Sequence, residues 1–236
     1  MLNFKTKPII AMLHLMGNTS DDVLERAKRE TNIYFDNGVD AVLVENYFGS
    51  TDDCKRVLEY LCSHMPDKLF GVNILGDYKA AFRLAKDYKA DFVQIDSVCG
   101  HLRPAQDETY AAELMKSKKD MPFQVLGGLR FKYQPIRSGR TLADDAALAK
   151  LRCEAVVTTG EGTGIDCPTE KLRKFRDVLN DFPLIVGAGV TAANVKEKLI
   201  YSDGAIIGSW FKDNHDARGE VRPEYVRELM KAAREG

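Results

Sequence analysis

The chain has 236 residues, of which 34 are lysine or arginine and 35 are aspartate or glutamate, so the net charge is −1. This balance gives no electrostatic reason to expect nucleic acid or an anionic membrane as a partner. No apolar run reaches the length of a membrane span, and the first residues lack the pattern of a signal peptide. We therefore expect no transmembrane segment.

The cysteines indicate reduced thiols rather than disulfides. There are five of them, an odd number, and no pair has the Cys-x-x-Cys spacing of a zinc site. We expect a cytoplasmic location, no bound metal and no cofactor.

Short apolar runs alternate with amphipathic helical stretches eight times along the chain. The pattern predicts strand 9–14, helix 20–37, strand 41–46, helix 51–65, strand 69–74 and helix 78–88. It continues with strand 92–96, helix 109–118, strand 123–126 (extending as far as 131), helix 141–151, strand 155–159 and helix 169–179. The last two strands lie within 183–191 and 203–209, and helices 192–199 and 223–234 follow them.

This alternation predicts a parallel sheet covered by helices. A closed (β/α)₈ barrel has about 250 residues, so we expect residues 1–236 to form one such TIM barrel, with both ends near its amino-terminal face. A doubly wound open sheet is the alternative, but it places its glycine-rich phosphate loop after the first strand. Here residues 15–19 hold one glycine and the glycine-rich turns come late, which favours the closed barrel.

The two late turns predict a phosphate site, because each apolar run ends in glycine. Backbone N–H groups approach an anion closely only where no Cβ intervenes, and barrels often bind phosphate in the loops after strands 7 and 8. The structural alternative is two tight turns without a ligand. The predicted phosphate-binding residues are Gly187, Ala188, Gly189, Gly208 and Ser209.

Polar residues collect at the carboxyl ends of the predicted strands, where barrels keep their active sites. Each alone has a structural alternative, such as a cap or a surface ion pair, but together they favour one polar pocket. The candidate catalytic residues are His14, Glu45, Asp96, Lys132 and Glu161, with Lys212 as a further cation. The candidate substrate-binding residues are Asn46, Asn73, Arg130, Thr159, Gly160 and Thr163.

Several chemistries are disfavoured. Strand 155–159 holds no lysine, so a Schiff-base aldolase would depend on Lys132 as a substitute. His14, Glu45 and Asp96 are far apart in the sequence, which makes them a weak metal-binding pattern. The chain has no Ser-His-Asp signature and no nucleotide P-loop.

On these motifs the chain resembles the BtpA/SgcQ family, which falls among the ribulose-phosphate-binding barrels, over nearly its whole length. The more specific stretches are 44–46, 71–75 and 157–164, whereas 186–191 and 203–208 recur in many phosphate-binding barrels. The resemblance offers two functions, a factor for photosystem I accumulation and a nucleosidase or sugar-metabolism enzyme. The chain departs from the family at residues 16–19, which replace a proline-rich segment, and at Gly128 and Arg130, which replace an acidic residue and a histidine.

Three functions remain open at this point. The first is an enzyme that cleaves or transfers at a ribose-phosphate glycosidic bond, with Glu45 or Asp96 stabilising an oxocarbenium ion or activating water and Arg130 binding a second anion. The second is a sugar-phosphate isomerase or aldolase. The third is a non-catalytic BtpA-like factor for photosystem or membrane-complex biogenesis. The expected partners are a phosphorylated small molecule and, as an option, a second copy of the chain.

Overall fold

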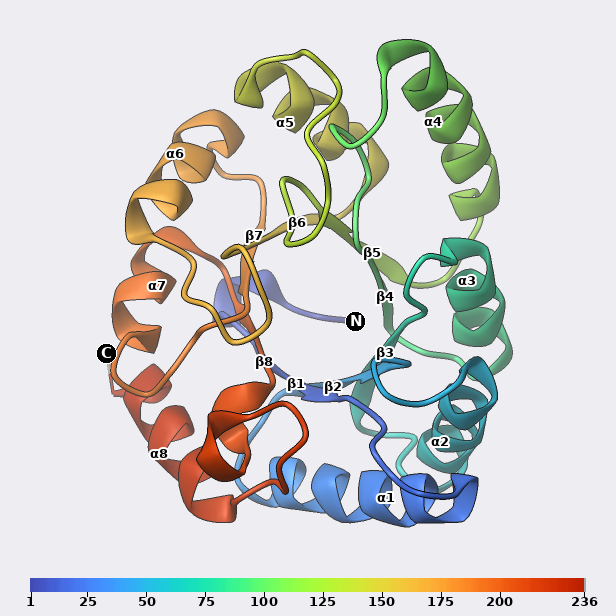
Figure 1. Cartoon of the computed structure of the whole chain (residues 1–236), viewed down its shortest axis with the longest axis vertical. Helices are drawn as coiled ribbons and strands as arrows, with labels where there is room; N and C mark the ends of the chain where they lie inside the picture. The colour runs from blue at the N-terminus through green and yellow to red at the C-terminus, as the bar shows by residue number, and fades with distance from the viewer. Residues whose placement is uncertain (236) are drawn as a thin grey trace.

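The computed structural model describes residues 1–235. Eight parallel strands close into a barrel in the order β1 to β8, and a ring of helices surrounds it (Figure 1). The strands are β1 Ile9–Leu13, β2 Ala41–Glu45, β3 Leu69–Asn73, β4 Phe92–Ile95, β5 Gln124–Gly128, β6 Ala155–Thr159, β7 Leu184–Gly187 and β8 Ala205–Ile207. The helices are α1 Ser20–Asp36, α2 Thr51–His64, α3 Tyr78–Asp87, α4 Pro104–Lys118, α5 Leu142–Arg152, α6 Thr169–Leu179, α7 Val195–Tyr201 and α8 Pro223–Arg234. The predicted barrel is thereby confirmed.

Three predicted boundaries were wrong for local reasons. Helix α4 begins at Pro104 rather than at residue 109, because proline fits the first helical turn. Helix α7 begins at Val195, since Thr191 and Asn194 form a hydrogen-bonded turn before it. Strand β5 ends at Gly128, and Arg130 has a φ of +47°, which turns the chain out of the strand direction.

The helix starts follow from capping chemistry that the sequence displays. Thr19 accepts a hydrogen bond from the N–H of Asp22, whose carboxylate accepts one from Thr19 in return. The same reciprocal pair opens α2 at Ser50 and α5 at Thr141. Each box satisfies two backbone donors that a helix end would otherwise leave unpaired.

Side chains alternate along each strand between the barrel interior and the helices. The apolar interior is formed by Leu2, Ile10, Met12, Ala41, Leu43, Phe92, Leu126, Phe131, Ala155, Val157, Ile185 and Ile206. At the amino-terminal end the Met1 amino group lies 3.0 Å from Asp91, just before β4. Arg234 binds the carboxylate of Asp40, just before β2. Both chain ends therefore lie at the amino-terminal face, as predicted.

Candidate active site

Side chains that alternate along the strands fill the barrel interior and also place polar groups at the carboxyl ends of the strands, which we call the mouth of the barrel. The residue two positions beyond an interior side chain faces the same way, so Met12, Leu43 and Phe92 are followed by polar residues at the carboxyl ends of β1, β2 and β4. On β5, β7 and β8 the equivalent position is glycine. The mouth positions are His14, Glu45, Asn73, Gln94, Gly128, Thr159, Gly187 and Gly208.

Two carboxyl groups meet through one amide. Glu45 and Asn73 are register partners on β2 and β3. The Asn73 Nδ2 group donates to Glu45 Oε1 at 2.9 Å and to Asp96 Oδ1 at 3.1 Å. Asn73, at the end of β3, therefore links the carboxyl of Glu45 at the end of β2 to the carboxyl of Asp96 just after β4. The three side chains form one wall.

Burial governs the protonation of this pair. Desolvation raises the pKa of Glu45 to about 7, although the positive charge of Lys132 opposes the rise, and the neighbouring Asp96 adds to it. Desolvation also raises the pKa of Asp96. A carboxyl with a pKa near neutrality can both donate and accept a proton at physiological pH, which suits general acid–base catalysis.

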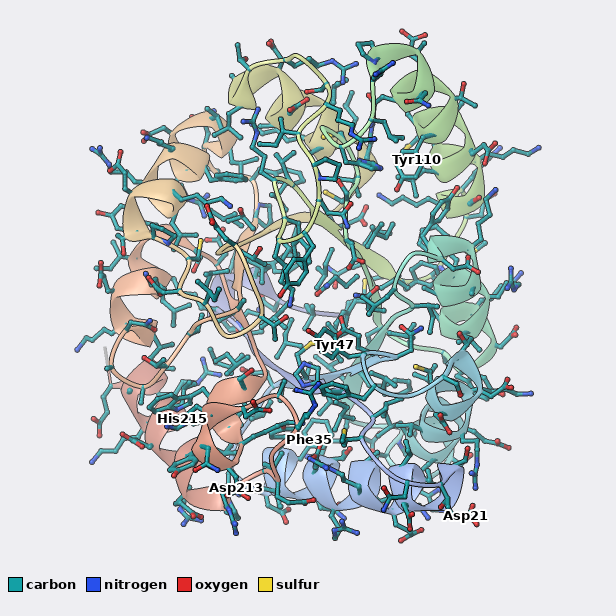
Figure 2. All side chains as sticks on the ribbon, viewed as in Figure 1. Asp21, Phe35, Tyr47, Tyr110, Asp213 and His215 are labelled. Carbon is teal, nitrogen blue, oxygen red and sulfur yellow. The ribbon has the colours of Figure 1, made fainter. Side chains whose placement is uncertain are left out.

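Lys132 reaches the same mouth from the loop after β5. Its ammonium donates to Thr163 Oγ1 at 2.8 Å, and the hydroxyl of Tyr47 lies 3.1 Å from the same oxygen. The Lys132 backbone N–H donates to Thr159 Oγ1 at 2.7 Å, which ties the loop to the end of β6. The loops after β2, β5 and β6 are thus joined over the barrel. Tyr47 lies near its centre in Figure 2.

His14 is buried at the end of β1 beside Gly208, where any added Cβ would lie 2.7 Å from the imidazole Cε1. Burial lowers the pKa of His14 well below its usual value, and the positive charges of Lys212 and Lys132 act in the same direction. Its Nδ1 makes no hydrogen bond with any residue in 1–235. The ring is therefore neutral at pH 7 and can offer a nitrogen to a ligand.

The turns after β7 and β8 expose backbone donors. Ala188 and Gly189 both have a φ of +66°, so two successive residues take the left-handed conformation. A Cβ at Gly189 would overlap the backbone of Asp166, which explains the glycine there. Within residues 1–235 the N–H groups of Gly189, Gly208 and Ser209 donate no hydrogen bond, whereas the register of β7 on β8 directs the N–H of Ala188 to the carbonyl of Ile206. Successive unpaired N–H groups of this kind form an anion-binding concavity.

These groups line one cavity, which we call the main cleft, with about 680 Å³ of space that includes its open mouth. Acidic and imidazole groups stand on the β1–β2 side, and backbone donors stand on the β7–β8 side. Its polar and glycine lining includes His14, Glu45, Gln94, Lys132, Thr159, Thr163, Gly187, Gly189, Gly208 and Ser209, together with Ala188.

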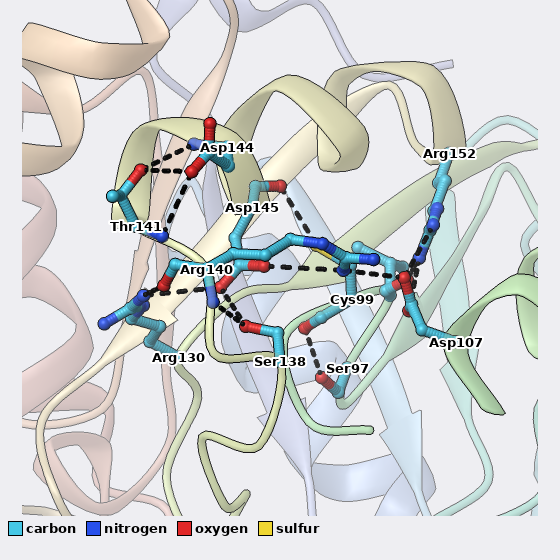
Figure 3. A network of polar contacts seen from close by, with 11 residues as sticks. Ser97, Cys99, Asp107, Arg130, Ser138, Arg140, Thr141, Asp144, Asp145 and Arg152 are labelled. Carbon is cyan, nitrogen blue, oxygen red and sulfur yellow. Dashed lines mark hydrogen bonds and ion pairs between the residues drawn. The ribbon is translucent and has the colours of Figure 1, made fainter. Parts of the chain in front are cut away.

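A buried ion network holds the loops after β4 and β5 (Figure 3). Arg152 binds Asp107 through two hydrogen bonds of 2.8 and 3.0 Å and also donates to the carbonyl of Val98. Arg140 joins the same carboxylate at 2.9 Å. Because Asp107 is fully buried, these bonds are protected from water and fix the surroundings of the site.

Some predicted site residues lie away from the main cleft. Arg130 turns toward the buried Asp145, 3.3 Å from its carboxylate. Glu161 is exposed in a neighbouring depression, which Gly160 and Arg130 also line. The remaining displaced residues serve the scaffold: Asn46 accepts a hydrogen bond from the Leu75 N–H, and Lys212 is buried 3.7 Å from Glu30.

The fold also brings to the site residues that were not predicted from the sequence. Gln94 is buried in β4 and faces the cleft. A signal was present, since a polar residue two positions before Asp96 shares its face of the strand. Tyr47, Trp210 and His215 also reach the cleft or its rim. They lie in loops, where no periodic pattern marks which side chains turn inward.

In the described part of the chain no three His, Cys, Asp or Glu side chains are grouped closely enough to hold a metal ion. None of the helices within residues 1–235 is both long and apolar enough to cross a membrane.

The fold and the cleft define a (β/α)₈ barrel with its polar site at the carboxyl ends of the strands. More particularly, the chain belongs to the BtpA family, whose model matches residues 5–235. An uncharacterized protein of Thermococcus kodakarensis is 30% identical, with 99% of this chain and 98% of that protein covered. The photosystem I biogenesis protein BtpA of Synechocystis is 24% identical, with 97% and 88% covered.

Solved structures confirm the fold at greater distance. The 3-hexulose-6-phosphate synthase of Salmonella typhimurium superposes with a TM-score of 0.68. The two chains are 16% identical, and the match covers 96% of this chain and 98% of that one.

Proposed function

We propose that this protein is an enzyme that cleaves a ribose-phosphate glycosidic bond. The observation that carries the proposal is the arrangement of one cleft: unpaired backbone donors after β7 and β8 face the buried carboxyl of Glu45, which Asn73 joins to the half-buried carboxyl of Asp96 just after β4. The first group suits a phosphate, and the second suits a reaction that separates charge and moves a proton. The fold neighbour that acts on a sugar phosphate supports the same substrate class.

In this proposal the phosphate binds the N–H groups of residues 189, 208 and 209, and the ribose lies across the cleft toward Glu45. As the glycosidic bond breaks, positive charge develops on the sugar ring. One carboxylate of the Glu45–Asp96 pair stabilises that charge and activates water, while the protonated partner gives its proton to the leaving group. The positive charge of Lys132 opposes the rise in the pKa of Glu45 and so favours its carboxylate form.

The network around Arg130 favours water over pyrophosphate as the second reactant. A pyrophosphate donor or product would need a second cationic site in the cleft. Arg130, the candidate for that role, instead contacts buried Asp145. Hydrolysis needs no second anion, so it is the simpler reaction for this cleft.

The test is to incubate the protein with a panel of nucleoside 5′-monophosphates and to measure any released base by chromatography. Glu45→Gln and Asp96→Asn keep the size and hydrogen bonding of each group while removing its charge. We expect at least one of them to lower kcat by about 10²-fold or more, with ribose 5-phosphate binding kept. Glu228→Gln is the matched control, because Glu228 is exposed on α8. Equal turnover in all four proteins would refute the assignment.

Lys132 favours a second candidate, isomerisation or aldol cleavage of a sugar phosphate. Its ammonium lies in the cleft and, within residues 1–235, contacts no carboxylate at ion-pair distance. The same panel separates the candidates, since free sugar phosphates would be converted without release of a base. Tight binding with no turnover of either substrate class would favour an assembly role like that named for the Synechocystis relative.

A further inference from the structure

A second hollow, which we call the side pocket, opens next to the main cleft between the loops after β3 and β4. It has about 580 Å³ of space that includes its open mouth. Gln94 lines both hollows, so they adjoin. Its aromatic and polar lining includes Tyr78, Gln94, Asp96, His101, Tyr110 and Gln134.

The walls of the side pocket are aromatic. The ring of Tyr110 packs edge-on against His101 at 5.2 Å between centroids and against Tyr78 at 5.7 Å. The Tyr110 hydroxyl donates to the carbonyl of Ser97 at 2.8 Å, which fixes the ring. In Figure 2 Tyr110 lies on the α4 side of the barrel, farther from the centre than Tyr47. Rigid rings of this kind offer faces and edges to a flat ligand.

Hydrogen-bonding groups in the side pocket are left without protein partners. Among the described residues His101 Nδ1 is buried without a well-formed hydrogen bond, and its polar neighbour is the backbone of Cys99, which raises the pKa of the ring. Burial lowers the pKa of His101, so the ring is neutral at pH 7. The carboxamide of Gln134 lines the pocket and has no side-chain hydrogen bond to another described residue. A buried polar atom without a partner is costly, and a ligand with matching groups would satisfy it.

The carboxyl pair stands at the boundary of the two hollows. Glu45 lines the main cleft, Asp96 lines the side pocket, and Asn73 is hydrogen-bonded to both. A ligand whose sugar occupies the main cleft would therefore extend past the pair into the side pocket. Its leaving group would lie next to Asp96 rather than Glu45.

We propose that the side pocket binds the departing base, a flat heteroaromatic ring with hydrogen-bonding edges, and that the base takes its proton from the Glu45–Asp96 pair beside it. This rests on the proposed glycosidic cleavage. The C1′–N bond breaks and its electron pair stays on the base nitrogen, which takes the proton that the Glu45–Asp96 pair holds. A water molecule forms the new C1′–O bond and releases its proton to the carboxylate of the same pair. Stacking and hydrogen bonding by the pocket would then select the base.

The experiment is calorimetric titration of the protein with adenine, hypoxanthine, uracil and nicotinamide, each with and without saturating ribose 5-phosphate. The variants are His101→Ala and Gln134→Ala. Their matched controls are His64→Ala, an exposed histidine at the end of α2, and Gln106→Ala, an exposed glutamine on α4. Melting temperature and ribose 5-phosphate affinity are measured for every variant, which separates loss of fold from loss of the pocket.

We expect at least one base to bind together with ribose 5-phosphate, because the two ligands occupy different hollows. His101→Ala should weaken that base at least tenfold while leaving ribose 5-phosphate affinity within twofold, and the controls should match the wild type. Competition between base and ribose 5-phosphate would overturn the proposal. So would binding of none of the four bases, or wild-type base affinity in both pocket variants.

The outcomes also separate this inference from the proposed function. If nucleoside monophosphates are cleaved but the pocket variants keep wild-type base affinity, the side pocket assignment alone fails. If a base binds with the expected His101 dependence but no monophosphate is cleaved, the proposed reaction fails and the pocket remains a binding site.

Discussion

The raised pKa of Glu45 makes the stability of the protein depend on pH in a direction that can be measured. A rise from 4.5 to about 7 corresponds to about 3 kcal/mol of penalty on the ionised form, since each pKa unit is worth about 1.36 kcal/mol. The folded protein keeps a proton on Glu45 between these two values, whereas the unfolded chain releases it. Glu45 therefore lowers the free energy of unfolding as pH rises from about 4.5 to 7.

The assay is urea unfolding of wild type and Glu45→Gln at pH 5 and pH 8. Glutamine does not titrate, so the difference in unfolding free energy between the two proteins should move by about 2 to 3 kcal/mol in favour of the variant at pH 8. Glu228→Gln should change by less than about 0.5 kcal/mol. A difference that stays constant between the two pH values would show that Glu45 titrates normally and would remove its role as an acid–base group.

A second substitution tests which groups set the pKa of Glu45. The charge of Lys132 lowers the pKa of Glu45 and partly offsets the effect of burial. Lys132→Met should therefore move the midpoint of the pH-dependent change above its wild-type value. A midpoint that moves down instead would mean that the two side chains are not coupled as the structure places them.

Three further predictions concern the anchor, the scaffold and the thiols. Ser209→Asp puts a negative charge beside the unpaired N–H groups and should weaken ribose 5-phosphate binding at least about tenfold, whereas Ser209→Asn should not, as titration calorimetry would show. Asp107→Asn breaks a buried bidentate pair with Arg152 and should cost about 3 to 5 kcal/mol in urea unfolding, against almost nothing for exposed Asp181→Asn. Burial raises the pKa of the thiols of Cys54, Cys99, Cys153 and Cys167. In the native protein at pH 8, a disulfide reagent should therefore react readily with the half-buried Cys62 alone.

The barrel could be predicted from sequence because its signals are local and repeated. Each strand is a short apolar run, and several helices open with a capping box such as Thr19 with Asp22. The late glycines after β7 and β8 distinguish this fold from an open sheet. Boundaries such as the start of α4 were less predictable, because proline can either end a segment or begin a helix.

The site was predictable only where strand periodicity reaches it. The sequence predicts that Glu45, Asn73 and His14 face the barrel interior, because each stands two positions after an inward-facing position of its strand. Loop residues obey no such period. Arg130 was expected at the cleft, but buried Asp145 draws it away. The side pocket depends on how the loop holding His101 packs against α4, and that is decided by contacts between distant segments.

The mouth of the barrel is divided into two chemically different halves. The inward position is glycine on β5, β7 and β8 and threonine on β6, whereas it carries histidine, glutamate, asparagine or glutamine on β1 to β4. The glycine positions on β7 and β8 leave backbone donors, which hold an anion but cannot exchange protons at neutral pH. The other half holds Glu45, whose burial raises its pKa to about 7, and Asp96, whose pKa burial also raises. Binding and chemistry would then depend on different residues, so substitution of Glu45 should affect turnover without releasing the phosphate.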